Sequence, residues 1–337
     1  MAFLGRKLLI PLRDALVYAL AKAILVLFSL LPPRIGFYAA RQCGSLLYFL
    51  GRRRRNIALR NLDIAFGEKL PVEEKRRVAR RTFQHALAIF LGLSLRGRHL
   101  RKDNLHQVFH ILPEEDDLLS KPHPKGLAVL SAHVGDWEMA EHYFALRSIR
   151  ATVVTSEISN PLISSELKRR RSRNGMRVIH KEGALREIRS RLRQGGVVGL
   201  LPDQNSPKRE RFFEFFGVPA STYTDYARVL VRAGCRILLV VCIREGFQLR
   251  YRVVVRDLGI ELPELPGVPS ADRAGLRADE LVRGYLKAVE DLARQEPEQY
   301  WWGHRRWKSR PTGAPWLYHD LGKPLGPKAM ERESLFQ

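Results

Sequence analysis

The pattern of apolar and polar positions divides the chain into an N-terminal part with helical spacing and a later part in which short apolar runs alternate with amphipathic stretches. In the N-terminal part, apolar side chains recur on one helix face in residues 35–50, 53–66 and 71–95. Pro71, shortly before two glutamates, is typical of a helix start. Residues 98–124 are polar and lack a clear period, so they predict an irregular connection.

From Gly126 onward the pattern predicts strands that alternate with helices. The predicted strands are residues 127–131, 152–155, 177–179, 197–201, 237–243 and 251–255. The predicted helices include residues 184–194 and 281–293. This alternation indicates an α/β fold with a mixed, mostly parallel sheet flanked by helices.

Residues 15–31 form an apolar stretch that only Lys22 interrupts. Together with residues 8–12 it approaches the ~20 residues that cross a bilayer. Arg13, Asp14 and Lys22 also fit a buried or amphipathic helix, so this alternative stays open beside the favoured one, membrane association. More basic residues follow the stretch than precede it, which predicts that the body lies on the cytoplasmic side if the segment spans. If the segment lies in the interface, the same residues hold it to anionic headgroups.

The charge of the chain is strongly basic, with 58 Lys and Arg against 35 Asp and Glu and a formal net charge of +23. Such an excess indicates an anionic partner: nucleic acid, lipid, or an acidic protein or substrate. The basic clusters are scattered, and no helix-turn-helix, zinc-finger or RNP motif is present, so we predict no nucleic-acid partner. The three cysteines are too few and too scattered for a disulfide framework, and no Cys/His cluster has the spacing of a metal site.

The sharpest candidate for chemistry is the segment Ala-His-Val-Gly-Asp-Trp-Glu, residues 132–138, at the end of a predicted strand. An acid, Glu138, follows His133 by five positions; Asp136 is the competing carboxylate and better suits a helix N-cap. A carboxylate on one ring nitrogen fixes the tautomer, so that the other nitrogen takes a proton from a hydroxyl. Neither a Gly-x-Ser-x-Gly elbow nor a Gly-rich nucleotide loop is present. The residues therefore suit direct acyl transfer to an alcohol, although a lone histidine is also often structural.

Four later segments could contribute side chains to a substrate cleft, and each could instead have a purely structural role. The strand at 197–201 ends in Pro-Asp-Gln, which places Asp203 and Gln204 in the same cleft or in a turn. Four phenylalanines in residues 212–216 suit either a core or the wall of an acyl groove. The basic run around Arg171 suits a solvated face or a phosphate site. Residues 300–308 mix aromatic rings and cations, as an interfacial belt does.

Taken in order, these motifs resemble those of the bacterial lipid A biosynthesis acyltransferases, the lauroyl and myristoyl transferases of the lysophospholipid acyltransferase superfamily. The resemblance covers roughly residues 31–311. The residues that carry it are Leu31-Pro32, residues 56–62, residues 133–138, Asp203-Gln204, residues 215–217 with 219–220, and residues 302–306.

The resemblance implies a glycerol-3-phosphate acyltransferase-like fold and an enzyme on the cytoplasmic face of the cell inner membrane. It would move a fatty acyl chain from acyl carrier protein to a hydroxyl of a lipid A precursor, without cofactor or metal. His133 would be the general base and Glu138 its dyad partner. The residues predicted to bind substrate are Arg171, Asp203, Gln204, Phe215 and Arg305. Backbone N–H groups at residues 134–135, or Arg171, are the alternatives for stabilising the oxyanion.

We predict four regions: a membrane anchor helix in 1–33, a helical region in 34–125, the acyltransferase domain in 126–312 and a tail in 313–337.

Two alternatives to the predicted function remain. The polar filling of the His133 box resembles the mannoside-lipid branch, which favours acyl-CoA-dependent transfer to a phosphatidylinositol mannoside or another phospholipid. A non-catalytic basic protein that binds membrane or nucleic acid is the alternative from a different class.

Overall fold

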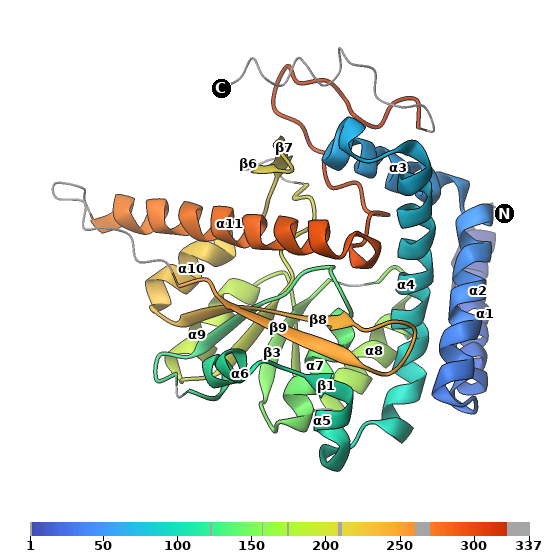
Figure 1. Ribbon diagram of the computed structural model, residues 1–337, viewed down its shortest axis with the longest axis horizontal. Coiled ribbons are helices and arrows are strands. Elements are labelled where there is room, and N and C mark those ends of the chain that lie inside the picture. Colours follow the sequence, from blue (N-terminus) through green and yellow to red (C-terminus); the bar gives the residue numbers. More distant parts are fainter. Residues whose placement is uncertain are drawn as a thin grey trace.

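The computed structural model describes residues 2–121, 123–156, 158–173, 175–207, 211–259 and 270–321. Its centre is a seven-stranded sheet of strand order β1-β9-β8-β2-β5-β3-β4 (Figure 1). Every neighbouring pair is parallel except β8 and β9. The strands are β1 (Phe109–His110), β2 (Leu127–Leu130), β3 (Ala151–Thr155), β4 (Arg177–His180), β5 (Val197–Leu200), β8 (Arg236–Arg244) and β9 (Tyr251–Asp257). The predicted mixed, mostly parallel α/β sheet is confirmed.

The central strand β2 is buried on both faces, and successive side chains enter two different cores. Ala128 and Leu130 belong to the larger core, with α9 (Ala184–Arg193), α10 (Asp225–Ala233) and α11 (Ser270–Gln295). Leu127 and Val129 belong to a second core, with α6 (Pro113–Ser120) and α7 (Trp137–Leu146). Such continuous apolar runs are typical of parallel strands covered by helices on both sides.

The N-terminal part is helical, as predicted, and its four helices stand beside one end of the sheet (Figure 1). They are α1 (Ala2–Ser29), α2 (Pro33–Leu50), α3 (Arg52–Phe66) and α4 (Val72–His99), with a short 3₁₀ turn, η1 (Gly67–Lys69), before α4. A third apolar cluster joins α1, α2 and α4 through Phe28, Phe37 and Ala88. The larger core also contains side chains of α3 and α4. The predicted boundaries between the anchor, the helical region, the acyltransferase domain and the tail stay a prediction. Residues 322–337 of the predicted tail lie outside the described residues.

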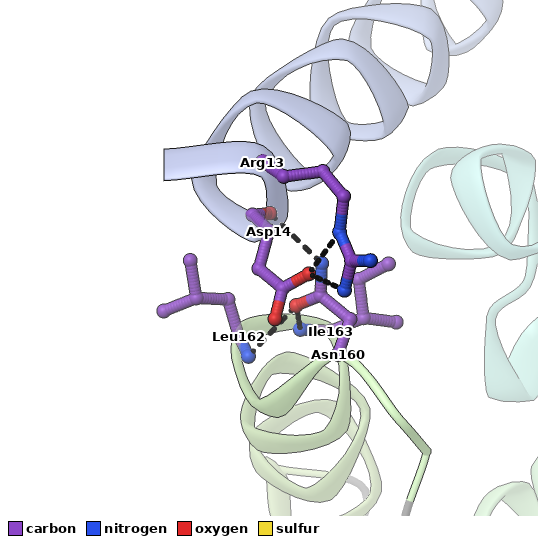
Figure 2. A network of polar contacts seen from close by, with 5 residues as sticks. All are labelled: Arg13, Asp14, Asn160, Leu162 and Ile163. Carbon is purple, nitrogen blue, oxygen red and sulfur yellow. Dashed lines mark hydrogen bonds and ion pairs between the residues drawn. The ribbon is translucent and has the colours of Figure 1, made fainter. Parts of the chain in front are cut away.

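Helix α1 is attached to the body of the protein rather than separate from it. Asn160 caps α8 (Pro161–Arg173) by accepting the backbone N–H groups of Leu162 and Ile163. Its side-chain amide donates to the carbonyl oxygen of Asp14 at 2.8 Å, which ties α1 to this helix start (Figure 2). Within the described part of the chain, no helix combines the length and apolar character needed to cross a membrane.

The prediction that residues 98–124 are irregular is wrong. The segment contains η2 (Lys102–Asn104), α5 (Leu105–Val108), β1 and α6. Helix α6 has proline and three acids in its first turn, which favours a helix start, and Glu115 accepts the N–H of Val255 in β9. These elements are too short to show a period, and contacts with the rest of the fold stabilise them.

Candidate active site

His133 lies in the loop between β2 and α7, and the fold of this loop explains its sequence. Gly135 has a φ of +64°, and a Cβ at this position would overlap the carbonyl oxygen of Cys242. Asp136 caps α7, since its Oδ1 accepts the N–H of Met139 at 3.0 Å, as predicted. The polar filling of the box is therefore explained by the turn itself.

Backbone hydrogen bonds hold the His133 loop on both sides. The carbonyl of His133 accepts from the N–H of Trp301 at 2.9 Å, and Gly135 donates to the carbonyl of Gln299 at 3.0 Å. Asp136 donates to the carbonyl of Cys242 at 2.7 Å. Since the N–H of Gly135 is engaged by Gln299, it is not available to an oxyanion in this arrangement.

The His133 ring is oriented by Asp203. Nδ1 lies 2.7 Å from Oδ1 of Asp203, and the second carboxylate oxygen accepts the backbone N–H of His133 at 2.9 Å. Burial would raise the pKa of Asp203, but the charge and hydrogen bonds of His133, and the charge of Arg306, bring it below its usual value. An ionised Asp203 favours the tautomer with the proton on Nδ1.

The other nitrogen of His133 is then an acceptor. Nε2 lies 3.1 Å from the side-chain amide nitrogen of Gln204, which donates to it. A hydroxyl that replaced this amide would find a nitrogen able to take its proton. The predicted pair Asp203 and Gln204 thus contacts His133 directly, one residue at each ring nitrogen.

Glu138 lies in the first turn of α7 and pairs with Arg171 of α8, Oε1 to Nη2, at 2.7 Å. Glu141 lies 3.1 Å from Nε of the same guanidinium. Burial would lower the pKa of Arg171, but the two glutamates outweigh it and raise the pKa. Arg171 is therefore a paired cation, and the carboxylate at Nδ1 of His133 is Asp203. The His133–Glu138 dyad stays a prediction.

A cleft of about 390 Å³ extends from His133 along the sheet. Its polar end contains His133, Glu138, Arg171 and Gln204. Its deeper wall is apolar and consists of Val129, Ala140, Phe144, Ala151, Val153, Met176 and Val197. Because Ala151 and Val197 begin β3 and β5, the cleft follows a whole strand, about 13 Å at the usual rise per residue.

Three of the five predicted substrate-binding residues are absent from the described lining of the cleft: Asp203, which is buried at Nδ1 of His133, and Phe215 and Arg305, which have other contacts. Phe215 belongs to the hairpin of β6 (Phe212–Phe215) and β7 (Val218–Ser221) and is fully buried against Trp307, with ring centroids 5.8 Å apart. Arg305 lies over the ring of Tyr318 at 5.8 Å. Neither is among the described residues of the cleft, so the phenylalanine run here forms core rather than an acyl groove.

The segment after α11 supports Asp203 from behind, a role that the sequence did not reveal. Trp302 and Trp307 are fully buried, so the interpretation of this segment as an interfacial belt is wrong for them. Arg306 is also buried, donates to the carbonyl of Ser221 at 2.8 Å, and lowers the pKa of Asp203. Only the density of aromatic and cationic residues marked this segment, and that pattern does not tell a core from a belt.

The profile of the bacterial lipid A biosynthesis acyltransferases matches residues 6–309. The chain belongs to this family. It is 25% identical over 303 residues to the lipid A biosynthesis palmitoleoyltransferase of Escherichia coli (strain K12), covering 88% of this chain and 92% of that protein. It is 26% identical over 289 residues to the lauroyltransferase of the same strain, covering 82% and 86%. It is 23% identical over 299 residues to the myristoyltransferase, covering 87% and 88%.

The predicted family and the predicted acyltransferase activity are confirmed. The alternative of a non-catalytic basic protein no longer fits. The roles of the individual site residues stay a prediction; in the structure His133 lies beside Asp203 and lines an apolar cleft.

Proposed function

We propose that this acyltransferase moves a fatty acyl chain from acyl carrier protein to a hydroxyl of a lipid A precursor. The observation that carries the proposal is the position of His133 at the polar end of a long apolar cleft. A thioester carbonyl near His133 would leave room for the acyl chain along the strands. The names of the relatives, all lipid A transferases of palmitoleoyl, lauroyl or myristoyl groups, support this acceptor.

In the proposed reaction, His133 Nε2 takes the proton of the acceptor hydroxyl while the oxygen attacks the thioester carbon. The C–S bond then breaks, the new ester forms, and the imidazolium returns its proton to the leaving thiolate. Asp203 keeps the ring in the competent tautomer and stabilises the imidazolium. We assign Glu138 the role of holding Arg171 at the polar end of the cleft, which modifies the predicted dyad.

An acidic carrier protein suits the basic surface beside the cleft. Helix α8 exposes Lys168, Arg169 and Arg173, and a small cavity of about 100 Å³ next to the cleft includes Lys168. Complementary charge speeds the encounter of such partners. We therefore propose that the carrier protein docks on α8.

We also propose that α1 and α2 lie against the cytoplasmic face of the inner membrane. Both helices expose large apolar side chains: Leu12, Leu16, Leu20 and Leu27 on α1, and Ile35, Tyr38, Leu46, Leu47, Phe49 and Leu50 on α2. Arginines 52–55 follow α2 directly, as expected where a helix meets anionic headgroups.

The polar filling of the His133 box gives no support to a mannoside-lipid acceptor. Gly135 is required by its positive φ and by the contact with Cys242, and Asp136 is required as a cap. These residues are therefore explained without reference to a substrate, and the acyl-CoA alternative loses the feature that favoured it.

The test is transfer of a fatty acyl chain from its carrier-protein thioester to a lipid A precursor by the purified protein, with the acyl-CoA thioester in parallel. We expect transfer from the carrier protein, and a loss of about 10²–10⁴-fold in kcat for His133→Ala, which should still fold but with a lower Tm because Asp203 loses a hydrogen-bond partner. Near-normal transfer by His133→Ala would refute the mechanism. Mass spectrometry of glycolipids from hosts with and without the gene identifies the acceptor.

A further inference from the structure

A separate cavity, of about 520 Å³, adjoins the His133 loop through its lining residues His85 and Gln299, which both contact Gly135. Side chains of α2, α4, the β8–β9 hairpin and the segment after α11 surround it, and it shares no lining residue with the acyl cleft. We name it the Arg244 cavity after the buried arginine in its wall. None of the roles discussed above uses it.

Arg244 is 4% exposed and has no carboxylate at ion-pair distance among the described residues. Its Nη2 donates to Nδ1 of His85, and its guanidinium lies 5.5 Å from the ring of Phe37 and 5.3 Å from that of Phe247. Its Nη1 is buried without a hydrogen-bond partner in the part of the chain that the structure describes. Burial lowers the pKa of Arg244, and the more distant Asp136 and Tyr251 only partly oppose this. Buried charges in proteins are normally paired.

The other charges around the cavity are mostly compensated. Three ion pairs neutralise its carboxylates: Arg81–Glu298, Arg252–Glu296 and Arg250–Glu245. Arg41 of α2 is exposed, and its described contact is with the ring of Phe247, at 5.5 Å. Among the described residues that line the cavity, the two arginines without a carboxylate partner are therefore Arg244 and Arg41, and both contact the ring of Phe247.

We propose that the Arg244 cavity binds a phosphate group, with Arg244 and Arg41 as its cationic partners. Guanidinium groups offer several N–H donors in a planar fork that matches phosphate oxygens. The volume exceeds what a bare phosphate fills, so a phosphate ester with a polar headgroup also fits. Phe247 lies in the hairpin turn, is half-buried, and places its ring 5.3 Å from the guanidinium of Arg244.

The site adjoins the catalytic loop through His85. Its Nε2 donates to the carbonyl of Gly135 at 3.0 Å, while its Nδ1 accepts from Arg244. Burial and the charge of Arg244 hold the pKa of His85 well below its usual value, so the ring is neutral in this bridge. A phosphate bound to Arg244 is therefore connected to Gly135 of the His133 loop by two hydrogen bonds, Arg244 to His85 and His85 to Gly135.

The test measures binding, so it does not depend on acyl transfer and can succeed where the proposed function fails. Thermal unfolding of the purified full chain in neutral detergent is followed with sodium phosphate and with sodium chloride at equal ionic strength. We expect phosphate to raise Tm by roughly 2–4 °C at tenfold excess over its Kd. Arg244→Met should abolish this shift, and Arg283→Met, which removes an exposed, paired arginine of α11, should leave it unchanged.

The proposal is overturned if neither inorganic phosphate nor phosphatidic acid raises Tm, or if the shift in Arg244→Met equals that of the wild type. If Arg244→Met does not fold, Arg41→Met decides, because this exposed side chain tolerates replacement; it should require about tenfold more phosphate. Vesicles of phosphatidylcholine with and without phosphatidic acid distinguish the sources. An Arg244-dependent shift with phosphatidic acid alone assigns the site to a lipid phosphate, and one with inorganic phosphate alone assigns it to a small free anion.

Discussion

Two carboxylates beside the cleft have different partners and therefore different consequences when removed. Asp203 is buried and contacts His133 at both Nδ1 and the backbone N–H. Glu138 contacts the guanidinium of Arg171 and shares it with Glu141. Charge on Asp203 acts on the base itself, whereas charge on Glu138 acts on an arginine that has a second acidic partner.

We therefore expect Asp203→Asn to lower kcat by about 10²–10⁴-fold, because the imidazolium loses its stabilising charge. Glu138→Gln should lower it far less, because Glu141 still pairs with Arg171. Initial rates at saturating donor and acceptor measure both. The control is Asp279→Asn, which breaks a pair with Arg211 away from the cleft. A larger loss in Glu138→Gln than in Asp203→Asn would restore the His133–Glu138 dyad.

His304 predicts a pH dependence of stability. Burial lowers its pKa to about 4, and its Nε2 accepts the N–H of Asn205 at 3.2 Å. Since an unfolded histidine has a pKa of about 6.5, the unfolded chain binds the extra proton between these values. The free energy of unfolding therefore has its full value above pH ~6.5. It falls by up to about 3 kcal/mol as the pH falls toward 4, because the unfolded chain gains a proton that the folded chain does not.

His304→Gln keeps an acceptor for Asn205 but does not titrate. Between about pH 7 and pH 4.5, the Tm of the wild type should therefore fall more steeply than that of the variant. Calorimetry across this range gives both curves. Parallel curves would mean that His304 titrates alike in the folded and unfolded chains.

At the scale of the elements, long periodic segments were predictable and short ones were not. The helices in 35–50, 53–66 and 71–95 have strong periods and the buried strands are marked apolar runs, and the structure confirms both. The β6–β7 hairpin was not predicted, because a run of four phenylalanines has no period and its pairing depends on the core around Trp307.

For the site, the sequence predicted which residues come together but not which side chains contact each other. Sequence placed His133, Asp203 and Gln204 at neighbouring strand ends, and the structure brings them together. It could not show which of the two acids meets Nδ1, because this depends on the side-chain directions of segments 70 residues apart. For the same reason Arg305 was chosen, while its neighbour Arg306 is the buried residue whose charge lowers the pKa of Asp203.

The cleft predicts that the start of β3 limits acyl-chain length. Ala151 lines the cleft at the first residue of β3, the end of this parallel strand away from the loop of His133, so Ala151→Leu should displace the end of the chain. Each displaced methylene loses about 0.8 kcal/mol, or about fourfold in kcat/KM, for the longest chains only. A series of carrier-protein thioesters of increasing length measures the profile. The control, Ala145→Leu on α7, lies outside the described lining of the cleft, and an unchanged profile in Ala151→Leu would exclude this path for the chain.

At the scale of the whole molecule, exposed apolar side chains are concentrated in a way that suits a membrane. Large exposed apolar side chains concentrate on α1 and α2, which stand together at one end of the sheet (Figure 1). The hydrogen bond between Asn160 and Asp14 ties α1 to α8, the helix that also contributes Arg171 to the cleft. A surface that binds the bilayer through α1 and α2 would therefore hold the cleft at a constant distance from its lipid acceptor.

This arrangement predicts that α2, and not only α1, binds the membrane. Leu46 and Leu50 are 56% and 69% exposed, so replacing both by Ser should leave Tm unchanged. Each leucine contributes about 1.5–3 kcal/mol when fully buried, so partial insertion of the pair should lower vesicle affinity at least about tenfold. Co-sedimentation with vesicles that contain phosphatidylglycerol measures this affinity, and the control is Leu276→Ser on α11, which is 45% exposed.

Equal binding by the double variant and the wild type would leave α1 and the basic residues as the membrane contacts. A loss confined to high salt would indicate that charge, rather than apolar contact, dominates.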